Sequence, residues 1–232
     1  MAKRSILALA AALAVAAAHG AAPTGAAEPA AKAPATYDLL FRDGALDEID
    51  KSGALIYRRD VTSALAPQAA ERDSGEIALT FAEEAATLAR LELRRDGAAR
   101  PLGSFPASVG NPMIMFFYET VVRDMAEAAG GSPFYIRNRV KEALVRPGEV
   151  TKGEAEIDGR VAETVTVRMA PFADDPNRDR MRGFGDLTLV VTMSEAAPGW
   201  YLSFVADAGA ATEGGPPVYR SEVTLTGFEA GE

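Results

Sequence analysis

The chain has 232 residues, of which 25% are charged, and its formal net charge is −9 at neutral pH. It contains no cysteine, and its single histidine is His19, at the edge of an expected export signal. The exported chain would therefore lack both residues, which excludes Ser-His-Asp and Cys-His catalysis and any zinc, copper or haem site built on them. The catalytic groups that stay compatible with this composition are paired carboxylates, Ser-Lys pairs and oxygen-ligated metals. A strongly acidic surface also disfavours nucleic acid and anionic lipid head groups as partners.

The N-terminal residues have the features of a secretory signal in the usual order. Lys3 and Arg4 precede an apolar run over 6–18, and small residues follow at 18–22. The run is too short for a bilayer, which needs about 20 apolar residues. We predict a signal peptide over 1–20, although an apolar helix retained in the mature protein is the alternative. The mature protein would be periplasmic or secreted, with a net charge of about −11 once the two basic residues are removed.

The remaining chain divides into a lead-in and one domain. Residues 21–36 are mostly Ala, Pro, Gly and Thr, so we expect a disordered linker. Residues 37–232 form a single expected domain, large enough for its own core. No later segment has the length and hydropathy of a membrane span.

The first part of this domain is predicted to be mainly β-structure. Residues 37–52 suggest a short strand or helical turn, and "ALIYRRDV" (54–61) suggests a strand. Apolar and polar residues alternate in "GEIALTFA" and in "TLARLELRRDG", which is typical of half-buried strands. One helix through 81–95 is the competing interpretation, since its residues are good helix formers. We favour strands, with Asp96-Gly97 as a hairpin turn that leads into "AARPLGSF".

A helical hairpin is predicted over residues 111–146. Asn111 would cap the first helix with Pro112 at its first position, and Gly130 and Gly131 would end it. Ser132 and Pro133 begin the second helix by the same device. Apolar residues recur at helical spacing in both helices. In the first they are Ile114, Phe117, Tyr118, Val121, Val122 and Met125, and in the second they are Ile136, Val140 and Leu144.

Strand patterns return after this insert. Residues 149–169 predict a β-hairpin with Asp158-Gly159 as its turn, and further strands are expected over 186–193, 199–207 and 218–228. Because strands and helices do not alternate regularly, the fold class is α+β. We expect a curved antiparallel sheet or half-open barrel of about seven to nine strands, whose apolar face is covered by the helical hairpin.

The block "GNPMIMFFYETVVRDM…GGSPFYIRNRVKEAL" resembles that of uncharacterised exported proteins of alphaproteobacteria. The expected architecture, a half-open barrel closed by helices, resembles the periplasmic lipoprotein-carrier fold. In carriers the cavity holds acyl chains, so the resemblance implies an apolar ligand. No motif of that family is matched residue by residue.

Two interpretations of the apolar insert follow. Flexible thioethers and rings suit an acyl-binding cavity, but the same residues could simply form the core. The candidate ligand-binding residues are Ile114, Phe117, Tyr118, Val121, Met125 and Trp200. Of Trp200 and Tyr201, one ring is expected to face inward and the other outward. An exposed ring could hold a sugar, whereas packing of Trp200 in line with Leu202 and Phe204 is the alternative.

A calcium loop is the one metal site that the sequence suggests. Asp175, Asn177, Asp179 and Asp186 occupy positions 1, 3, 5 and 12 of an EF-hand loop. Arg180 replaces the glycine that such a loop needs, and the closing ligand is Asp rather than Glu. A solvated turn in which Asp and Arg side chains pair is therefore the alternative. No cofactor is expected.

Other charged residues suggest no specific chemistry. The adjacent acids Glu83-Glu84 and Asp174-Asp175 are expected to be surface charges, since glycosidase carboxylates usually lie on different elements. Arg137, Arg139 and Lys141 suggest a solvated face or an anion site.

Three functions remain open. The first is a non-enzymatic periplasmic protein that binds an apolar ligand or an envelope partner. The second is a structural or accessory envelope protein that acts through its surface. The third is a hydrolase built on carboxylates alone, which requires two acids facing each other in a cleft, one with a raised pKa.

Overall fold

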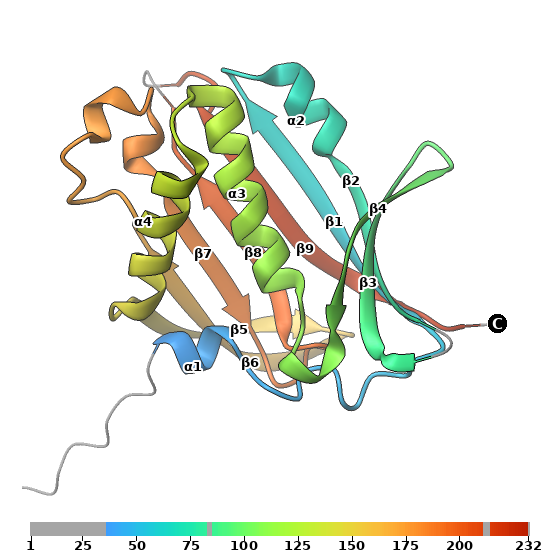
Figure 1. Cartoon of the computed structure of the whole chain (residues 1–232). Helices are drawn as coiled ribbons and strands as arrows, with labels where there is room; N and C mark the ends of the chain where they lie inside the picture. Colours follow the sequence, from blue (N-terminus) through green and yellow to red (C-terminus); the bar gives the residue numbers. More distant parts are fainter. Residues whose placement is uncertain (1–35, 83–84, 211–213, 232) are drawn as a thin grey trace, which may run out of the picture. The chain divides into compact units, whose positions relative to one another are not determined.

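The computed structural model describes residues 36–82, 85–210 and 214–231 (Figure 1). The expected signal peptide, nearly all of the expected linker, and the Glu83-Glu84 pair lie outside the described residues.

The described chain forms one open antiparallel sheet of nine strands in the order β4-β3-β2-β1-β9-β8-β7-β6-β5. The strands are β1 (Ala54–Ser63), β2 (Gly75–Ala82), β3 (Ala85–Arg95), β4 (Ala98–Pro106), β5 (Glu149–Ile157), β6 (Arg160–Met169), β7 (Thr188–Met193), β8 (Tyr201–Asp207) and β9 (Tyr219–Glu229). The sheet is curved, and the predicted α+β class is confirmed.

Four helices accompany the sheet: α1 (Thr36–Leu40), α2 (Pro67–Asp73), α3 (Met113–Ala129) and α4 (Pro133–Val145). Short 3-10 turns lie at η1 (Ala107–Val109), η2 (Arg178–Arg180) and η3 (Phe184–Asp186). Figure 1 shows α3 and α4 side by side across one face of the sheet, with α3 over its middle strands. The predicted helical hairpin and its covering position are confirmed.

Local turn chemistry explains the strand hairpins. Asp96 and Gly97 have φ angles of 51° and 75°, and Asp158 and Gly159 have φ angles of 50° and 74°. This left-handed pair of conformations matches the twist of antiparallel strands, and Asp-Gly adopts it at low cost. The strand interpretation is also confirmed for residues 75–82 and 85–95, because β2 and β3 form a continuous ladder from Glu76↔Arg94 to Phe81↔Ala89.

Several local expectations need correction. Residues 67–73 form α2, which the sequence analysis did not predict. Of the two alternatives for residues 37–52, the helical turn is confirmed by α1. The strand expected from 186 begins only at Thr188, because η3 precedes it. Ser132 is the N-cap residue of α4 but makes no side-chain capping bond.

Asn111 fixes the start of α3 to the sheet. Its side-chain oxygen accepts a hydrogen bond from the backbone N–H of Met113 at 3.0 Å, as expected of a capping side chain. The N-cap position itself is Pro112, one residue later than predicted. Its Nδ2 donates to the hydroxyl of Tyr57 at 3.0 Å and to the carbonyl of Gly199 at 2.8 Å. Because Asn111 is buried, these bonds hold the helix start on the inner face of β1.

The two faces of the sheet differ sharply in polarity. In β1 the inward residues Leu55 and Tyr57 are fully buried, while the outward Arg58 and Asp60 are exposed. Arg59 breaks the pattern, because it is a charged residue on the apolar inner face. Within the described residues, no helix combines the length and hydropathy that crossing a membrane requires.

Candidate functional site

The structure brings together five of the six predicted ligand-binding residues and packs them as core. Ile114, Phe117, Tyr118, Val121 and Met125 all lie on the buried side of α3, with exposed fractions between 0% and 4%. The Phe117 ring lies 5.3 Å from the rings of both Tyr118 and Phe204, measured between centroids. The stripe is therefore continuous with the main hydrophobic cluster of the sheet.

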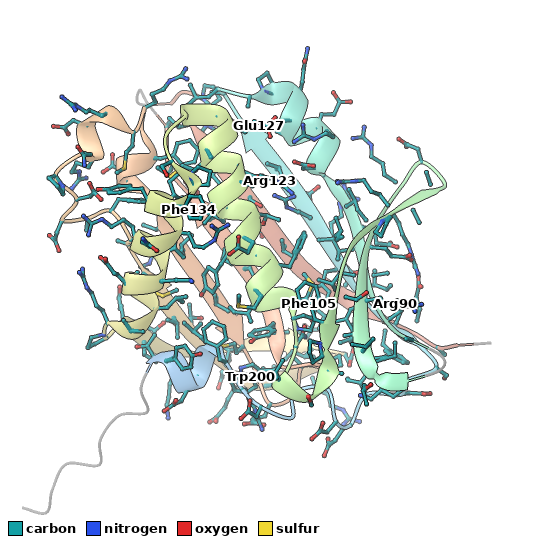
Figure 2. The ribbon with its side chains drawn as sticks, in the orientation of Figure 1. Arg90, Phe105, Arg123, Glu127, Phe134 and Trp200 are labelled. Atoms are coloured by element: carbon teal, nitrogen blue, oxygen red, sulfur yellow. The ribbon has the colours of Figure 1, made fainter. Side chains whose placement is uncertain are left out.

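Trp200, the sixth residue, lies below α3 near α1 (Figure 2). Its indole N–H donates to the carbonyl of Leu39 at 3.0 Å, and the Arg42 guanidinium lies 4.4 Å from its ring centroid. Trp200 and Tyr201 are both buried, so the expectation that one ring faces outward is wrong. The reason is that Trp200 has a φ angle of 80° and precedes β8, so strand alternation does not apply to it.

The predicted calcium residues serve other contacts. Asp175 is buried, and its carboxylate accepts hydrogen bonds from the Tyr135 hydroxyl at 2.8 and 2.9 Å and from the backbone N–H of Asn177 at 2.8 Å. Arg139 pairs with it at 2.8 Å. Burial raises the pKa of Asp175, but these donors outweigh burial and hold the pKa below its usual value.

Asp186 pairs instead with Arg178, as the alternative interpretation expected. In the part of the chain that the structure describes, no group of three or more His, Cys, Asp or Glu residues could hold a metal ion. The expectation that Asp174 and Asp175 are both surface charges is wrong for Asp175, which fastens α4 to the 170–186 segment through Arg139.

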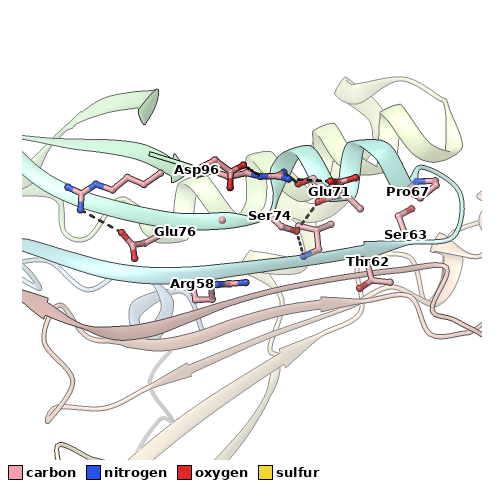
Figure 3. Close-up of a pocket in the computed structure, with 13 residues that line it drawn as sticks. Arg58, Thr62, Ser63, Pro67, Glu71, Ser74, Glu76 and Asp96 are labelled. Carbon is pink, nitrogen blue, oxygen red and sulfur yellow. Dashed lines mark hydrogen bonds and ion pairs between the residues drawn. The ribbon is translucent and has the colours of Figure 1, made fainter. Parts of the chain in front are cut away.

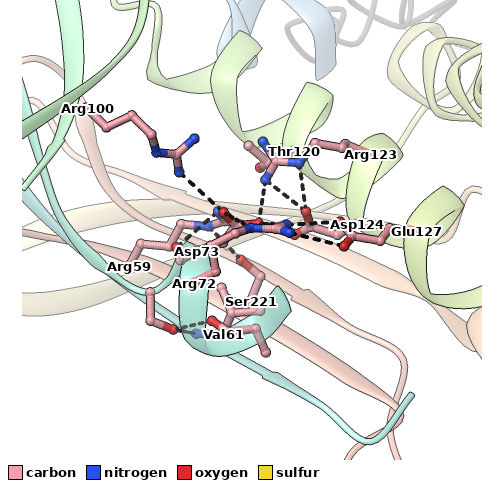
Figure 4. Close-up of polar contacts among 12 residues, drawn as sticks. Arg59, Val61, Arg72, Asp73, Arg100, Thr120, Arg123, Asp124, Glu127 and Ser221 are labelled. Carbon is pink, nitrogen blue, oxygen red and sulfur yellow. Dashed lines mark hydrogen bonds and ion pairs between the residues drawn. The ribbon is translucent and has the colours of Figure 1, made fainter. Parts of the chain in front are cut away.

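The sequence analysis missed the main polar feature of the inner face, which we call the arginine cluster. It lies where α2 and α3 approach β1 and β4, at one end of the covered face (Figure 4). Its members are Arg59, Arg72, Asp73, Arg100, Arg123, Asp124 and Glu127.

The inner half of the cluster is a buried ion pair. Arg59 Nη2 lies 2.6 Å from Asp124 Oδ2, and the two side chains are 3% and 9% exposed. The Tyr219 hydroxyl donates to the same oxygen at 2.8 Å. Burial and the neighbouring carboxylate raise the pKa of Tyr219, so its hydroxyl stays protonated and able to donate. Arg59 also donates to the backbone carbonyl of Asp73 at 3.2 Å.

The outer half gathers three arginines around one carboxylate. Asp73, whose side chain is 4% exposed, is contacted by Arg72 at 2.8 Å, by Arg123 at 3.1 Å and by Arg100 at 3.3 Å. Burial raises the pKa of Asp73, but the Arg72 hydrogen bond and the surrounding positive charges outweigh burial and lower it. The three arginine side chains themselves are 43% to 53% exposed, so solvent reaches them.

The cluster carries a surplus of positive charge. Arg123 also contacts Asp124 at 2.9 Å and Arg72 contacts Glu127 at 3.0 Å, so four guanidinium groups share three carboxylates. This surplus lies within a chain whose formal net charge is −9. The arrangement can hold an anion at its solvent side, and the neighbouring arginines hold the pKa of Asp73 and of Glu127 below the usual values, so neither carboxyl is poised as an acid. The carboxylate-only hydrolase therefore gains no support from this site.

The part of the core between α3 and β2–β4 adjoins the cluster. We call it the apolar compartment, and its side chains are packed against one another. Phe116 of α3, Leu91 and Leu93 of β3 belong to the main core, and Phe105 of β4 is half-buried against it. The Arg59 guanidinium lies 5.9 Å from the centroid of the Phe116 ring, so this ring borders both regions. Figure 2 places Phe105 beside the first turns of α3 and Arg123 further along the same helix.

Two pockets flank α2. A small space of about 10 Å³ lies between α2 and α3 and is lined by Asp73, Asp124 and Tyr219 among others. A wider open groove of about 680 Å³ lies between α2 and the adjoining ends of β1 and β2 (Figure 3). The charged residues of this groove pair with one another, as in Arg95–Glu71 and Arg94–Glu76, so it offers little unpaired charge to a ligand.

Comparison with known proteins adds little. No family model and no curated protein matches the chain. The crystal structure of the lipoprotein LppX of Mycobacterium tuberculosis is similar at 9% identity and a TM-score of 0.35, over 85% of this chain and 96% of that chain. This similarity is too low to transfer a function. The resemblance to exported alphaproteobacterial proteins stays a prediction.

Proposed function

We propose that this protein is a non-enzymatic, exported binding protein that takes an apolar, acyl-like molecule between α3 and the β2–β4 part of its sheet. The observation that carries the proposal is the apolar compartment at the open side of the sheet. There the buried Phe116, Leu91 and Leu93 are continuous with Leu102 and Phe105, which solvent still reaches. A partly exposed apolar rim over an apolar interior suits a ligand of the same chemistry.

Binding requires the compartment to widen, because its side chains are packed. The β3–β4 hairpin is the element best placed to move, since β4 is an edge strand that pairs with β3 alone. Its register with β3 also shifts between Leu91 and Glu92, which weakens the ladder locally. An edge hairpin with few partners opens at a lower free energy than the central strands. We therefore place access for the ligand between β4 and α3.

A second function is favoured by one specific observation. The predicted ligand-binding stripe of α3 is packed to between 0% and 4% exposure, as expected for an ordinary core. A protein with a filled core acts through its surface, so a structural or accessory role in the envelope is the alternative.

Native mass spectrometry of protein purified from its own host, together with solvent extraction, tests the first proposal. We expect an apolar molecule to accompany the wild-type protein. Phe105→Glu places a charge at the rim and should abolish binding. The matched control is Phe134→Glu on α4, where the ring is 75% exposed and away from the compartment, and it should retain the ligand.

Absence of any bound molecule, together with failure to bind an added fluorescent fatty acid, would overturn the proposal. A protein partner that co-purifies equally with wild type and Phe105→Glu would favour the surface-acting alternative. Cell fractionation tests export, for which we expect the chain outside the cytoplasm and shortened near residue 20.

A further inference from the structure

We infer that the ligand is an amphiphile with an oxyanion head, a carboxylate or phosphate, which Arg100 and Arg123 bind at the mouth of the apolar compartment. The inference rests on the proposed function and specifies the ligand of the same site. It starts from the charge surplus of the arginine cluster, where four guanidinium groups share three carboxylates.

Arg100 and Arg123 have donors to spare. The described residues give Arg100 one hydrogen bond, from Nη2 to Asp73 at 3.3 Å, which is long for a charged pair. Arg123 uses Nε and Nη2 on Asp73 and Asp124, and no bond from its Nη1 is found with the described residues. A guanidinium group presents several N–H donors in a planar fork that matches an oxyanion. Both side chains are therefore able to accept a further anionic partner.

Solvent access separates these two arginines from the structural one. Arg100 and Arg123 are 53% and 43% exposed. Arg59 is 3% exposed, and its nitrogens are shared among Asp124, the Asp73 carbonyl and Ser221. The buried pair alone can fasten α3 to β1. Arg100 and Arg123 are each one of three arginines that contact Asp73, so the loss of either one leaves that carboxylate paired. The outer arginines are therefore available for recognition.

Arg100 lies on the same face of the sheet as the apolar compartment, so the arginine cluster and the compartment are adjacent. In β4, Arg100 pairs with Leu93 and Phe105 pairs with Ala89. Leu93 and Ala89 are buried on the inner face, so Arg100 and Phe105 lie on that face as well. An acyl chain along Phe105 would thus bring its head group to the arginines. Figure 4 shows Arg100 and Arg123 approaching Asp73 from β4 and α3.

The experiment compares dodecanoate, dodecyl phosphate and the uncharged dodecanol by titration calorimetry on the full mature protein. We expect both anions to bind about 10-fold more tightly than dodecanol, with an advantage that declines as salt is added. Arg100→Gln and Arg123→Gln should each reduce the advantage by about 3- to 10-fold and leave dodecanol binding unchanged. The matched control is Arg90→Gln, an exposed arginine on the outer face of β3, which should change neither.

The outcomes separate the two proposals. Equal affinity for dodecanol and the anions, or an advantage that survives both glutamine variants, would overturn the oxyanion head and leave the apolar ligand standing. Failure of all three amphiphiles would overturn the proposed function and the inference with it. Binding of inorganic phosphate alone, lost in Arg100→Gln, would replace the amphiphile with a free anion.

Discussion

Replacing the buried carboxylate of Asp124 should destabilise the protein strongly. Asp124→Asn keeps the size of the side chain and the acceptor for Tyr219, but it removes the only full charge that contacts Arg59 Nη2 among the described residues. Arg59 is 3% exposed, so its charge would remain in a medium that solvates it poorly. Removing one partner of such a pair costs about 3–5 kcal/mol.

That cost can be measured as a shift in unfolding. For a domain of this size, 1 kcal/mol corresponds to about 2–4 °C, so Tm should fall by roughly 6–20 °C. Urea unfolding followed by circular dichroism gives the free energy directly. The chain offers a matched control in the neighbouring pair Arg58–Asp60, at 2.9 Å with both side chains about 60% exposed. Asp60→Asn should cost less than about 1 kcal/mol.

Two results would refute this reasoning. Asp124→Asn could cost no more than Asp60→Asn, which would mean that water solvates Arg59 in the folded protein. Alternatively, the double variant Arg59→Met, Asp124→Leu could be as unstable as Asp124→Asn alone. We expect the double variant to recover most of the loss, because replacing both charges with apolar groups removes the uncompensated charge.

Three further predictions concern stability. The folded-state pKa of Asp73 lies below its usual value of 3.8, so its stabilisation is complete above that pH and is lost as pH falls through the lower folded value. In Asp73→Asn, the free energy of unfolding measured with urea should therefore fall less as the pH is lowered than it does in the wild-type protein. The same fall in both proteins would contradict the pairing. Gly110→Ala should cost more than Gly130→Ala in the same assay. Both glycines have positive φ angles, 97° and 80°. A Cβ at Gly110 would lie 2.5 Å from a backbone carbonyl oxygen, whereas a Cβ at Gly130 meets open space. Equal costs for the two variants would contradict the steric argument. Tyr118→Phe should be neutral or stabilising, because the buried Tyr118 hydroxyl has no partner among the described residues. Tyr201→Phe loses a 2.6 Å hydrogen bond to a backbone carbonyl and should lower the free energy of unfolding by about 1–2 kcal/mol, measured by thermal unfolding.

Much of the fold could be predicted because its signals are local. Period-two alternation identified β2 and β3 against a plausible helix, and the two Asp-Gly pairs located the turns of the β3–β4 and β5–β6 hairpins. Helical spacing after Asn111 identified α3 and its buried stripe. The expectation failed where a local pattern has two meanings. Trp200 lies just outside its strand in a left-handed conformation, so alternation assigned its ring to the wrong side.

The candidate site could not be predicted in the same way. The cluster draws on four elements, with Arg59 from β1, Asp73 from α2, Arg100 from β4, and Arg123 and Asp124 from α3. Apart from Arg59, nothing in their sequence neighbourhoods distinguishes these residues from surface charges. The one available signal was Arg59 at an inward position of an otherwise alternating strand.

The sequence by itself therefore determined that the chain has no cysteine and a single histidine, which segments other than α2 are strands or helices, and which face of most of them is apolar. These properties depend on residue type and on neighbours along the chain. Only the tertiary structure decided which charges are buried, since burial depends on α2, α3 and β4 meeting beside β1. Their packing brings together arginines and aspartates that lie far apart in the sequence. The resulting arginine cluster has an excess of positive charge and adjoins the apolar compartment.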